Sequence, residues 1–180
     1  MTVLALRQRR PAVLEDLLAA YGKEIQAVAY LIVRDRADAE DVVVETLVAA
    51  LEHGSELREE AALRSWLLRI ATNKALSIRR HTARVVRLET VPEGSSRSHE
   101  NDSLMRAVLI DGVNTLPPRM KAAIVLRYYA DLSVEECARA LGKSPNTVKA
   151  QLQEGLERLR SALADASGGA SQKALEARNV

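Results

Sequence analysis

The chain is poor in cysteine and in aromatic residues, and each shortage narrows the class of protein. Its 180 residues include one Cys, no Phe, one Trp and four Tyr. A single Cys excludes an intrachain disulfide and a cysteine-rich zinc site. The core therefore has to be aliphatic, and an aliphatic core of Leu, Val, Ile and Ala favours helices over strands. A chain of this length makes one domain or two small ones, and its apolar content of 47% is enough for a core.

Other missing features exclude most membrane and catalytic classes. The three histidines, at 53, 81 and 99, are too far apart in the sequence to indicate a metal site. No apolar run approaches the length of about 18 residues that a transmembrane helix needs. The N-terminus places its apolar residues before its charges, unlike a secretory signal. Phosphate-loop, dinucleotide-binding, zinc-protease and hydrolase motifs are also missing. We therefore expect a cytoplasmic protein that is not an enzyme and holds no metal or cofactor.

Charges of opposite sign are segregated along the chain, although 26 Lys and Arg nearly balance 24 Asp and Glu. Residues 1–57 contain six basic and ten acidic side chains, whereas residues 64–87 contain seven basic side chains and no acid. This basic stripe consists of Arg64, Arg69, Lys74, Arg79, Arg80, Arg84 and Arg87. Helical surfaces usually interleave both signs for i,i+4 pairing, so the stripe favours phosphate binding. A solvated helix face is the alternative.

Apolar residues recur at helical spacing in three segments of the N-terminal half, at about 11–33, 38–52 and 60–84. Asp38 is suited to cap the second helix, whose first turns are rich in carboxylates. The third helix carries the basic stripe, with Asn73 on the same polar face. Trp66 is spaced like a core residue, with a stacking platform for a base as the alternative.

The C-terminal half has the pattern of a second helical unit. Residues 88–102 are rich in Ser, Gly, Pro and charge, which predicts a flexible linker between a first domain at 10–87 and a second at 103–165. Helices are predicted at 103–114 and from 117 to about 129, and the tail at 166–180 is predicted to be flexible.

The most specific local pattern lies between Ser133 and Leu163. Ser133 followed by Glu136 forms a capping box, and Gly142 ends the helix that it opens. Ser144 and Pro145 then begin another helix. Two helices joined by a short turn with Gly indicate a helix-turn-helix, whose second helix enters the major groove of DNA. An ordinary helical hairpin is the alternative, and the single Cys is predicted to be a core residue.

Three segments resemble the extracytoplasmic-function sigma factors of bacterial RNA polymerase. Residues 38–47, DAEDVVVETL, resemble the acidic D-A-E-D-x-x-Q-E-x-F segment of that family. Residues 66–73, WLLRIATN, followed by Arg79 and Arg80, resemble its W-L-x-x-I-A-x-N segment with the two arginines after it. Residues 116–119, 125–128 and 133–149 resemble its region 4. These segments occur in the family's order, and the resemblance covers about residues 11–163.

The resemblance implies a fold and a function. The fold would be all-α, with a region 2 three-helix bundle and a region 4 helix-turn-helix joined by the linker. Such factors bind core RNA polymerase and direct it to promoter DNA, where region 2 binds and melts the −10 element and region 4 reads the −35 element. An anti-sigma factor commonly holds them inactive. The implied polymerase-binding residues are Asp38, Asp41 and Glu45. The implied −10 residues are Arg69, Asn73, Arg79, Arg80 and Arg84. The implied −35 residues are Asn146, Thr147, Lys149, Gln151 and Gln153.

The sequence also departs from the family pattern at several positions. Val44 stands where the family usually has Gln, and Glu154 stands where it often has Arg. Gly155 weakens the recognition helix by up to about 1 kcal/mol relative to Ala. Two alternatives to a working sigma factor therefore stay open. One is a sigma-like interaction protein or decoy with weakened polymerase or promoter binding, and the other is a helix-turn-helix regulator independent of polymerase.

Overall fold

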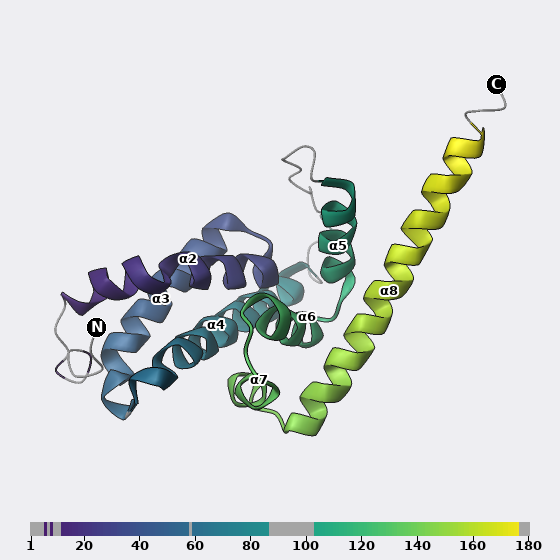
Figure 1. Cartoon of the computed structure of the whole chain (residues 1–180). Helices are drawn as coiled ribbons and strands as arrows, with labels where there is room; N and C mark the ends of the chain where they lie inside the picture. Colours follow the sequence, from purple (N-terminus) through teal and green to yellow (C-terminus); the bar gives the residue numbers. More distant parts are fainter. Residues whose placement is uncertain (1–5, 7, 9–11, 58, 87–102, 177–180) are drawn as a thin grey trace.

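The described part of the chain is built from helices (Figure 1). The computed structural model describes residues 6, 8, 12–57, 59–86 and 103–176. The elements, labelled as in Figure 1, are α2 Val13–Val33, α3 Arg36–His53, the 3-10 turns η1 Gly54–Glu56 and η2 Glu60–Ala62, α4 Leu63–Val86, α5 Ser103–Thr115, α6 Pro118–Ile124, the π-helical turn η3 Val125–Tyr129, α7 Val134–Leu141 and α8 Pro145–Glu176. No strand occurs within these ranges, which agrees with the predicted all-α fold. The predicted linker at 88–102 lies outside the described residues.

Helices α2, α3 and α4 form a first module, in which each helix packs against the other two. The apolar residues that recur at helical spacing face inward: Leu17, Ile25 and Ile32 of α2 and Leu67 and Ala71 of α4 are fully or almost fully buried. The aliphatic core that the composition predicts is thus confirmed in this module. The arrangement leaves one polar face of α3 and one of α4 toward solvent.

The start of α3 differs from the prediction by three residues. Arg34 ends α2 in the left-handed conformation (φ 66°), and the extended residue Asp35 caps α3. The Oδ1 atom of Asp35 accepts a hydrogen bond from the backbone N–H of Asp38 at 2.9 Å. The prediction that Asp38 caps the helix is therefore wrong. Asp35 and Asp38 are both aspartates, so either side chain could cap the helix. Asp35 does so because the left-handed residue before it, Arg34, places the turn at that point.

Helices α5 to α8 form a second module that contains the helix-turn-helix. Ser133 Oγ accepts from the Glu136 N–H at 3.2 Å, and Glu136 Oε2 accepts from the Ser133 N–H at 2.8 Å. Gly142 ends α7 at φ 61°, a conformation that costs glycine little. Ser144 Oγ accepts from the Thr147 N–H at 3.1 Å and so begins α8. The capping box, the glycine end and the second cap are all confirmed.

Helix α8 is longer than the sequence predicts. It has 32 residues and continues to Glu176, through most of the segment predicted as a flexible tail (Figure 1). That segment contains two neighbouring glycines, at 168 and 169, and glycine has low helix propensity. A helix that is already formed gains one hydrogen bond per added residue, so it can continue through residues of low propensity.

Gly155 has a packing role where α8 crosses α6. A Cβ atom at Gly155 would lie 3.1 Å from Ile124 Cγ1 and 3.2 Å from Met120 Cγ. The missing side chain therefore lets the two helices approach closely. This close approach offsets the low helix propensity that the sequence alone emphasises.

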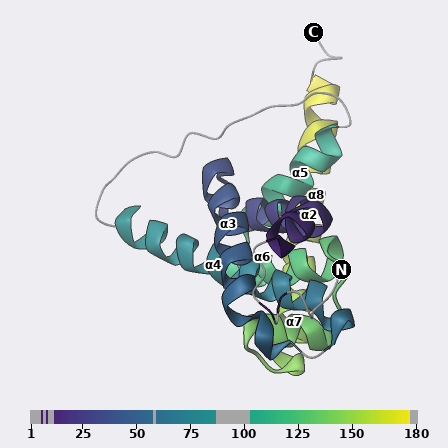
Figure 2. The same ribbon diagram turned by 90° about the vertical axis from the view of Figure 1, so that its left-hand side faces the viewer.

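The two modules pack directly against each other. Helices α6 and α7 contact α4, and η3 contacts α2. Figure 2 shows α6 and α7 beside α4, while the C-terminal half of α4 extends away from the second module. The sequence predicts two separate domains, and it gives no sign of this contact.

Candidate nucleic-acid interface

The outward face of α4 carries most of the predicted −10 residues. Arg69, Asn73 and Arg80 are exposed, and their spacing of four and seven residues places them on one side of the helix. Arg79 is half-buried, and the side chain of Arg84 lies outside the described residues. The opposite side of α4 is buried in the core. The helix therefore presents cations and an amide together on a solvent-facing surface.

Two members of the basic stripe form ion pairs with acidic residues of other helices. Lys74 Nζ lies 2.7 Å from Glu45 Oε2 on α3, and Arg64 forms an ion pair with Glu24 on α2. Both pairs join residues that are far apart in the sequence, so helical spacing alone could not reveal them. The stripe is thus partly structural, and its fully exposed part includes Arg69 and Arg80.

Trp66 lies partly buried against the core of the first module. This position supports the interpretation of Trp66 as a core residue rather than as a platform for an unstacked base. Asn73 and Arg80 are more exposed than Trp66. Arg80 Nε donates to the Leu76 carbonyl at 3.3 Å, which holds the stem of the side chain along the helix.

The three acidic residues predicted to bind polymerase have different environments on α3. Asp38 is half-buried, and its pKa is raised by burial and by the charges of Asp35 and Asp41. Glu45 is engaged by Lys74. Asp41 is exposed, and within the described residues no hydrogen bond or ion pair engages it. Asp41 is therefore the acidic residue best placed to meet a basic partner.

Two valines lie beside Asp41 on the outward face of α3. Val44 is 61% exposed and Val48 is 47% exposed, although Val is usually a core residue. Together with Asp41 they form the α3 outer face. Sequence reasoning noted Val44 only as a departure from the family and missed Val48. Their i,i+4 spacing, outside the buried stripe, was the signal that could have found both.

The N-terminal part of α8 carries the predicted −35 residues on two different sides. Asn146, Lys149 and Gln153 are exposed and share the outward face. Thr147 is exposed, but its hydroxyl lies 2.9 Å from Ser144 Oγ and takes part in the cap. Gln151 is half-buried, and its Oε1 atom is buried without a hydrogen-bond partner in the described structure. Gln151 is therefore less favourably placed than the other four.

Glu154 lies on the outward side of α8 and is paired within the helix. Arg158 Nη2 and Nε donate to Glu154 Oε1 at 2.7 and 3.2 Å. Both bonds go to Oε1, so neither of them uses Oε2 as its acceptor. The negative charge of Glu154 is thus partly compensated by the neighbouring Arg158.

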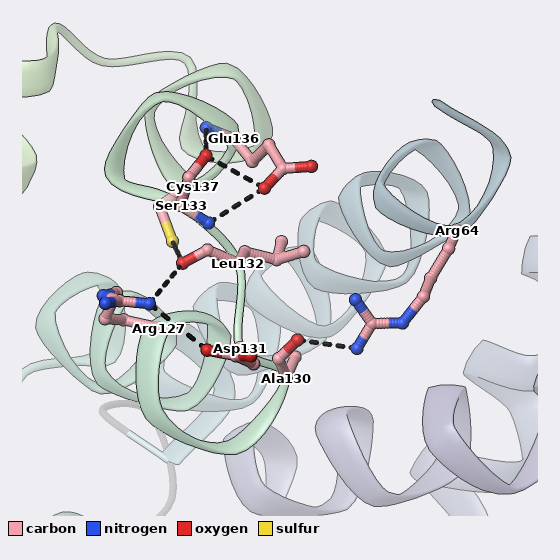
Figure 3. Close-up of polar contacts among 8 residues, drawn as sticks. All are labelled: Arg64, Arg127, Ala130, Asp131, Leu132, Ser133, Glu136 and Cys137. Atoms are coloured by element: carbon pink, nitrogen blue, oxygen red, sulfur yellow. Dashed lines mark hydrogen bonds and ion pairs between the residues drawn. The ribbon is translucent and has the colours of Figure 1, made fainter. Parts of the chain in front are cut away.

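Cys137 is buried in α7, as predicted. Its Sγ lies 3.8 Å from the Leu132 carbonyl oxygen (Figure 3), and burial raises the pKa of the thiol to about 11. A thiol with such a pKa is almost fully protonated at pH 8, and only the thiolate reacts with alkylating agents.

We therefore expect Cys137 to resist alkylation in the folded protein. At pH 8 the folded chain should react with iodoacetamide about 100-fold more slowly than the same chain in denaturant, because both burial and the raised pKa protect the sulfur. Mass spectrometry of timed, quenched samples measures the two rates. Similar rates in both conditions would show that α7 opens readily in the native state.

The described residues contain no group of three or more His, Cys, Asp or Glu arranged to hold a metal ion. None of the helices within the described ranges is long and apolar enough to cross a membrane.

Comparison with known proteins covers both modules. Residues 17–85 match the family described as Sigma-70 region 2, and residues 106–159 match Sigma-70, region 4. The RNA polymerase sigma factor SigV of Bacillus subtilis is 30% identical over 156 residues, covering 86% of this chain and 93% of the relative. The ECF RNA polymerase sigma factor SigL of Mycobacterium tuberculosis is 33% identical over 136 residues, covering 72% of this chain and 76% of the relative.

A solved structure has a similar fold over most of the chain. The sigma factor RpoE of Bartonella quintana, in complex with the anti-sigma factor NepR, matches with a TM-score of 0.71 and 25% identity. The match covers 83% of this chain and 96% of that chain. It includes residues of both modules, because neither module alone accounts for that share of the chain.

Proposed function

The chain belongs to the sigma-70 family of RNA polymerase sigma factors, of the extracytoplasmic-function type, and on that premise we propose which of its surfaces meet the polymerase and the two promoter elements. Sigma factors are regulatory proteins that direct promoter-specific initiation of transcription. Because its proposed partners are core RNA polymerase and promoter DNA, we infer that the chain acts in the cytoplasm.

The α3 outer face is the surface that docks on core polymerase. Asp41 is exposed and unengaged among the described residues, and it lies beside the exposed Val44 and Val48. A carboxylate next to an apolar patch suits a basic partner with an apolar centre, where charge sets orientation and association rate while burial supplies affinity. Asp38 contributes from the edge. Glu45 contributes only after it releases Lys74.

The outward face of α4 binds the −10 element as a single strand. The Asn73 amide can hydrogen-bond to the Watson–Crick edge of an unstacked base, and the Arg69 and Arg80 guanidinium groups can hold phosphates. Arg79 and Arg84 extend this surface along the helix. The observation that supports this assignment is the exposure of Arg69, Asn73 and Arg80 on one face with no acidic residue in α4.

The outward face of α8 reads the −35 element in the major groove. Lys149 supplies a phosphate contact, and Asn146 and Gln153 supply amides that can read adenine bidentately. Thr147 contributes from the first turn, and Gln151 contributes only if its buried amide turns outward. With Glu154 in place of an Arg, this surface is weakly basic, so we infer that region 4 of this chain reads its element with modest affinity.

An anti-sigma factor is the proposed inhibitor. The sigma factor of Bartonella quintana with a similar fold was solved with an anti-sigma factor bound. The exposed apolar residues Tyr128, Tyr129 and Leu109 give such a partner a surface to bury on the second module.

An equilibrium titration of the full chain against core RNA polymerase tests the docking assignment. Asp41→Lys should weaken binding by about tenfold or more, because it reverses a charge at the centre of the interface. Glu45→Lys should weaken it less, since Glu45 is already paired with Lys74. Glu15→Lys, which makes the same charge change on the exposed start of α2, is the matched control and should bind like the wild type. Equal losses for Asp41→Lys and Glu15→Lys would remove the α3 outer face from the interface.

A decoy that binds polymerase but initiates poorly is the second candidate. The observation in its favour is the pair of departures at Val44 and Glu154, one in each proposed interface. Run-off transcription with a promoter library separates the two candidates. A working factor gives promoter-dependent transcripts with the wild-type chain, whereas a decoy still binds core polymerase but gives none.

A further inference from the structure

The packing of α8 fixes which of its side chains points straight away from the core. Val148 is fully buried and Leu152 is 7% exposed, and the close approach of Gly155 to Ile124 holds the helix in this rotation. Ala150 lies two residues from both Val148 and Leu152, which is about 200° around the helix at about 100° per residue. Its side chain is exposed. Ala150 therefore occupies the centre of the outward face of α8.

The nearest neighbours of Ala150 on this face are amides. Asn146, four residues before it, and Gln153, three residues after it, are exposed on the same side of the helix. Gln153 Nε2 donates a long hydrogen bond to Glu157 Oε1 at 3.4 Å, and this bond uses neither Gln153 Oε1 nor the second Nε2 hydrogen. Asn and Gln amides match the N6 and N7 atoms of adenine. Ala150 is thus flanked on both sides by groups suited to adenine.

The cations that usually read guanine are scarce on this part of α8. Arg and Lys are the common bidentate partners of guanine O6 and N7 in the major groove. Residues 145–157 contain no Arg, and Lys149 is their only Lys. Lys149 is already assigned to a phosphate. The face around Ala150 therefore favours A·T pairs over G·C pairs.

The side chain of Ala150 is a single methyl group, which can make an apolar contact and no hydrogen bond. Among the four bases, only thymine presents an apolar group in the major groove, its 5-methyl. A short side chain at the centre of the face also lets the helix lie deep enough for the flanking amides to reach base edges. Asn146 and Gln153 are seven residues apart, about 10.5 Å along the helix, which spans about three base pairs.

We propose that Ala150 is a specificity-determining residue, whose methyl group packs on the 5-methyl of one thymine of the −35 element, between adenines contacted by Asn146 and Gln153. This proposal rests on the proposed function, because it requires α8 to lie in the major groove of that element. Removing the thymine methyl should weaken binding about fourfold, equivalent to the roughly 0.8 kcal/mol that burial of one methyl-sized group contributes.

Exchange of single thymines for deoxyuridine tests the contact directly, since the exchange removes the methyl group and keeps the base pair. A preferred duplex is first selected by the full chain from a pool with varied −35 sequences. Each thymine of that duplex is then exchanged in turn, and the affinity is measured by fluorescence anisotropy. The wild type should bind about fourfold more weakly after exchange at one thymine, next to an adenine, and should bind nearly unchanged after exchange at the others.

Two alanine-to-glycine variants assign the methyl effect to its residue. Ala150→Gly removes the contacting carbon, so it should bind the thymine and deoxyuridine duplexes equally. The two duplexes are compared on the same protein, so a lower helix stability of the variant cancels from the ratio. Ala164→Gly makes the same change at an exposed position farther along α8 and is the matched control. It should keep the fourfold ratio.

The outcomes separate this proposal from the function on which it rests. A selected duplex without a methyl-sensitive thymine, or a fourfold ratio that persists in Ala150→Gly, would overturn the contact and leave Ala150 as a surface residue that only favours the helix. A wild-type chain that selects no duplex sequence would reject the reading of the −35 element by α8, and the thymine contact with it.

Discussion

Replacing Asn73 and Arg80 together with alanine is expected to slow open-complex formation by about tenfold or more while leaving the affinity for core polymerase within about twofold of the wild type. Both side chains are exposed on α4, whereas the α3 outer face belongs to another helix. A hydrogen bond contributes about 0.5–1.5 kcal/mol, or about 1.5–3 kcal/mol when one of its groups is charged, and these contacts form only once the −10 element is unpaired. The loss should therefore appear in melting and not in docking.

Fluorescence of a base analogue in the −10 element, recorded as the holoenzyme opens the promoter, measures the melting rate. Titration against core polymerase measures docking on the same preparations. Ser77→Ala, which removes a small exposed side chain from the same helix, is the control and should leave both quantities unchanged. Equal losses in melting and docking would contradict the division of roles between α3 and α4.

The sequence was most informative where the physical cause is local. The Ser133–Glu136 box, the left-handed Gly142 and the Ser144 cap depend on residues within a few positions of one another, and all three are confirmed. The cap of α3 failed because two aspartates, at 35 and 38, compete for one role. Nothing in the side chains decides between them, and the decision comes from the left-handed backbone at Arg34.

The candidate site was less predictable because its decisive contacts are distant in sequence. Helical spacing placed Arg69, Asn73 and Arg80 on one face, and that arrangement is what the structure has. The same spacing could not show that Lys74 would be drawn to Glu45, or that Arg64 would reach Ala130, which is 66 residues away. Pairs of this kind depend on how whole helices pack. A run of cations therefore predicts a charged helix better than it predicts which cations stay free.

Glu154→Arg is expected to raise the affinity of the chain for −35 duplex DNA by about tenfold at low salt. The change removes a carboxylate from the outward face of α8, releases Arg158 from its pair with Glu154 Oε1, and adds a second cation. Each additional phosphate contact also steepens the dependence of log affinity on log salt by about 0.9. Arginines four residues apart repel by a few tenths of a kcal/mol, about 0.2–0.5, which is too little to cancel the gain.

Binding measured over a range of salt concentrations, on a pool of duplexes with varied −35 sequences, distinguishes repulsion from recognition. Glu15→Arg makes the same charge change on α2 of the first module and is the matched control, so it should leave duplex binding nearly unchanged. Glu154→Gln removes the charge without adding a cation.

If Glu154 only repels phosphates, both Glu154 variants bind every sequence more tightly and the preferred sequence stays the same. If Glu154 Oε2 instead accepts a hydrogen bond from cytosine N4, both variants lose preference at one base pair, because a bidentate or charged contact to a base contributes about 1–3 kcal/mol of discrimination. In that case the Arg158 pair is what holds the carboxylate in position to read DNA, and the departure from the family pattern at Glu154 changes the promoter that is chosen rather than the strength of binding.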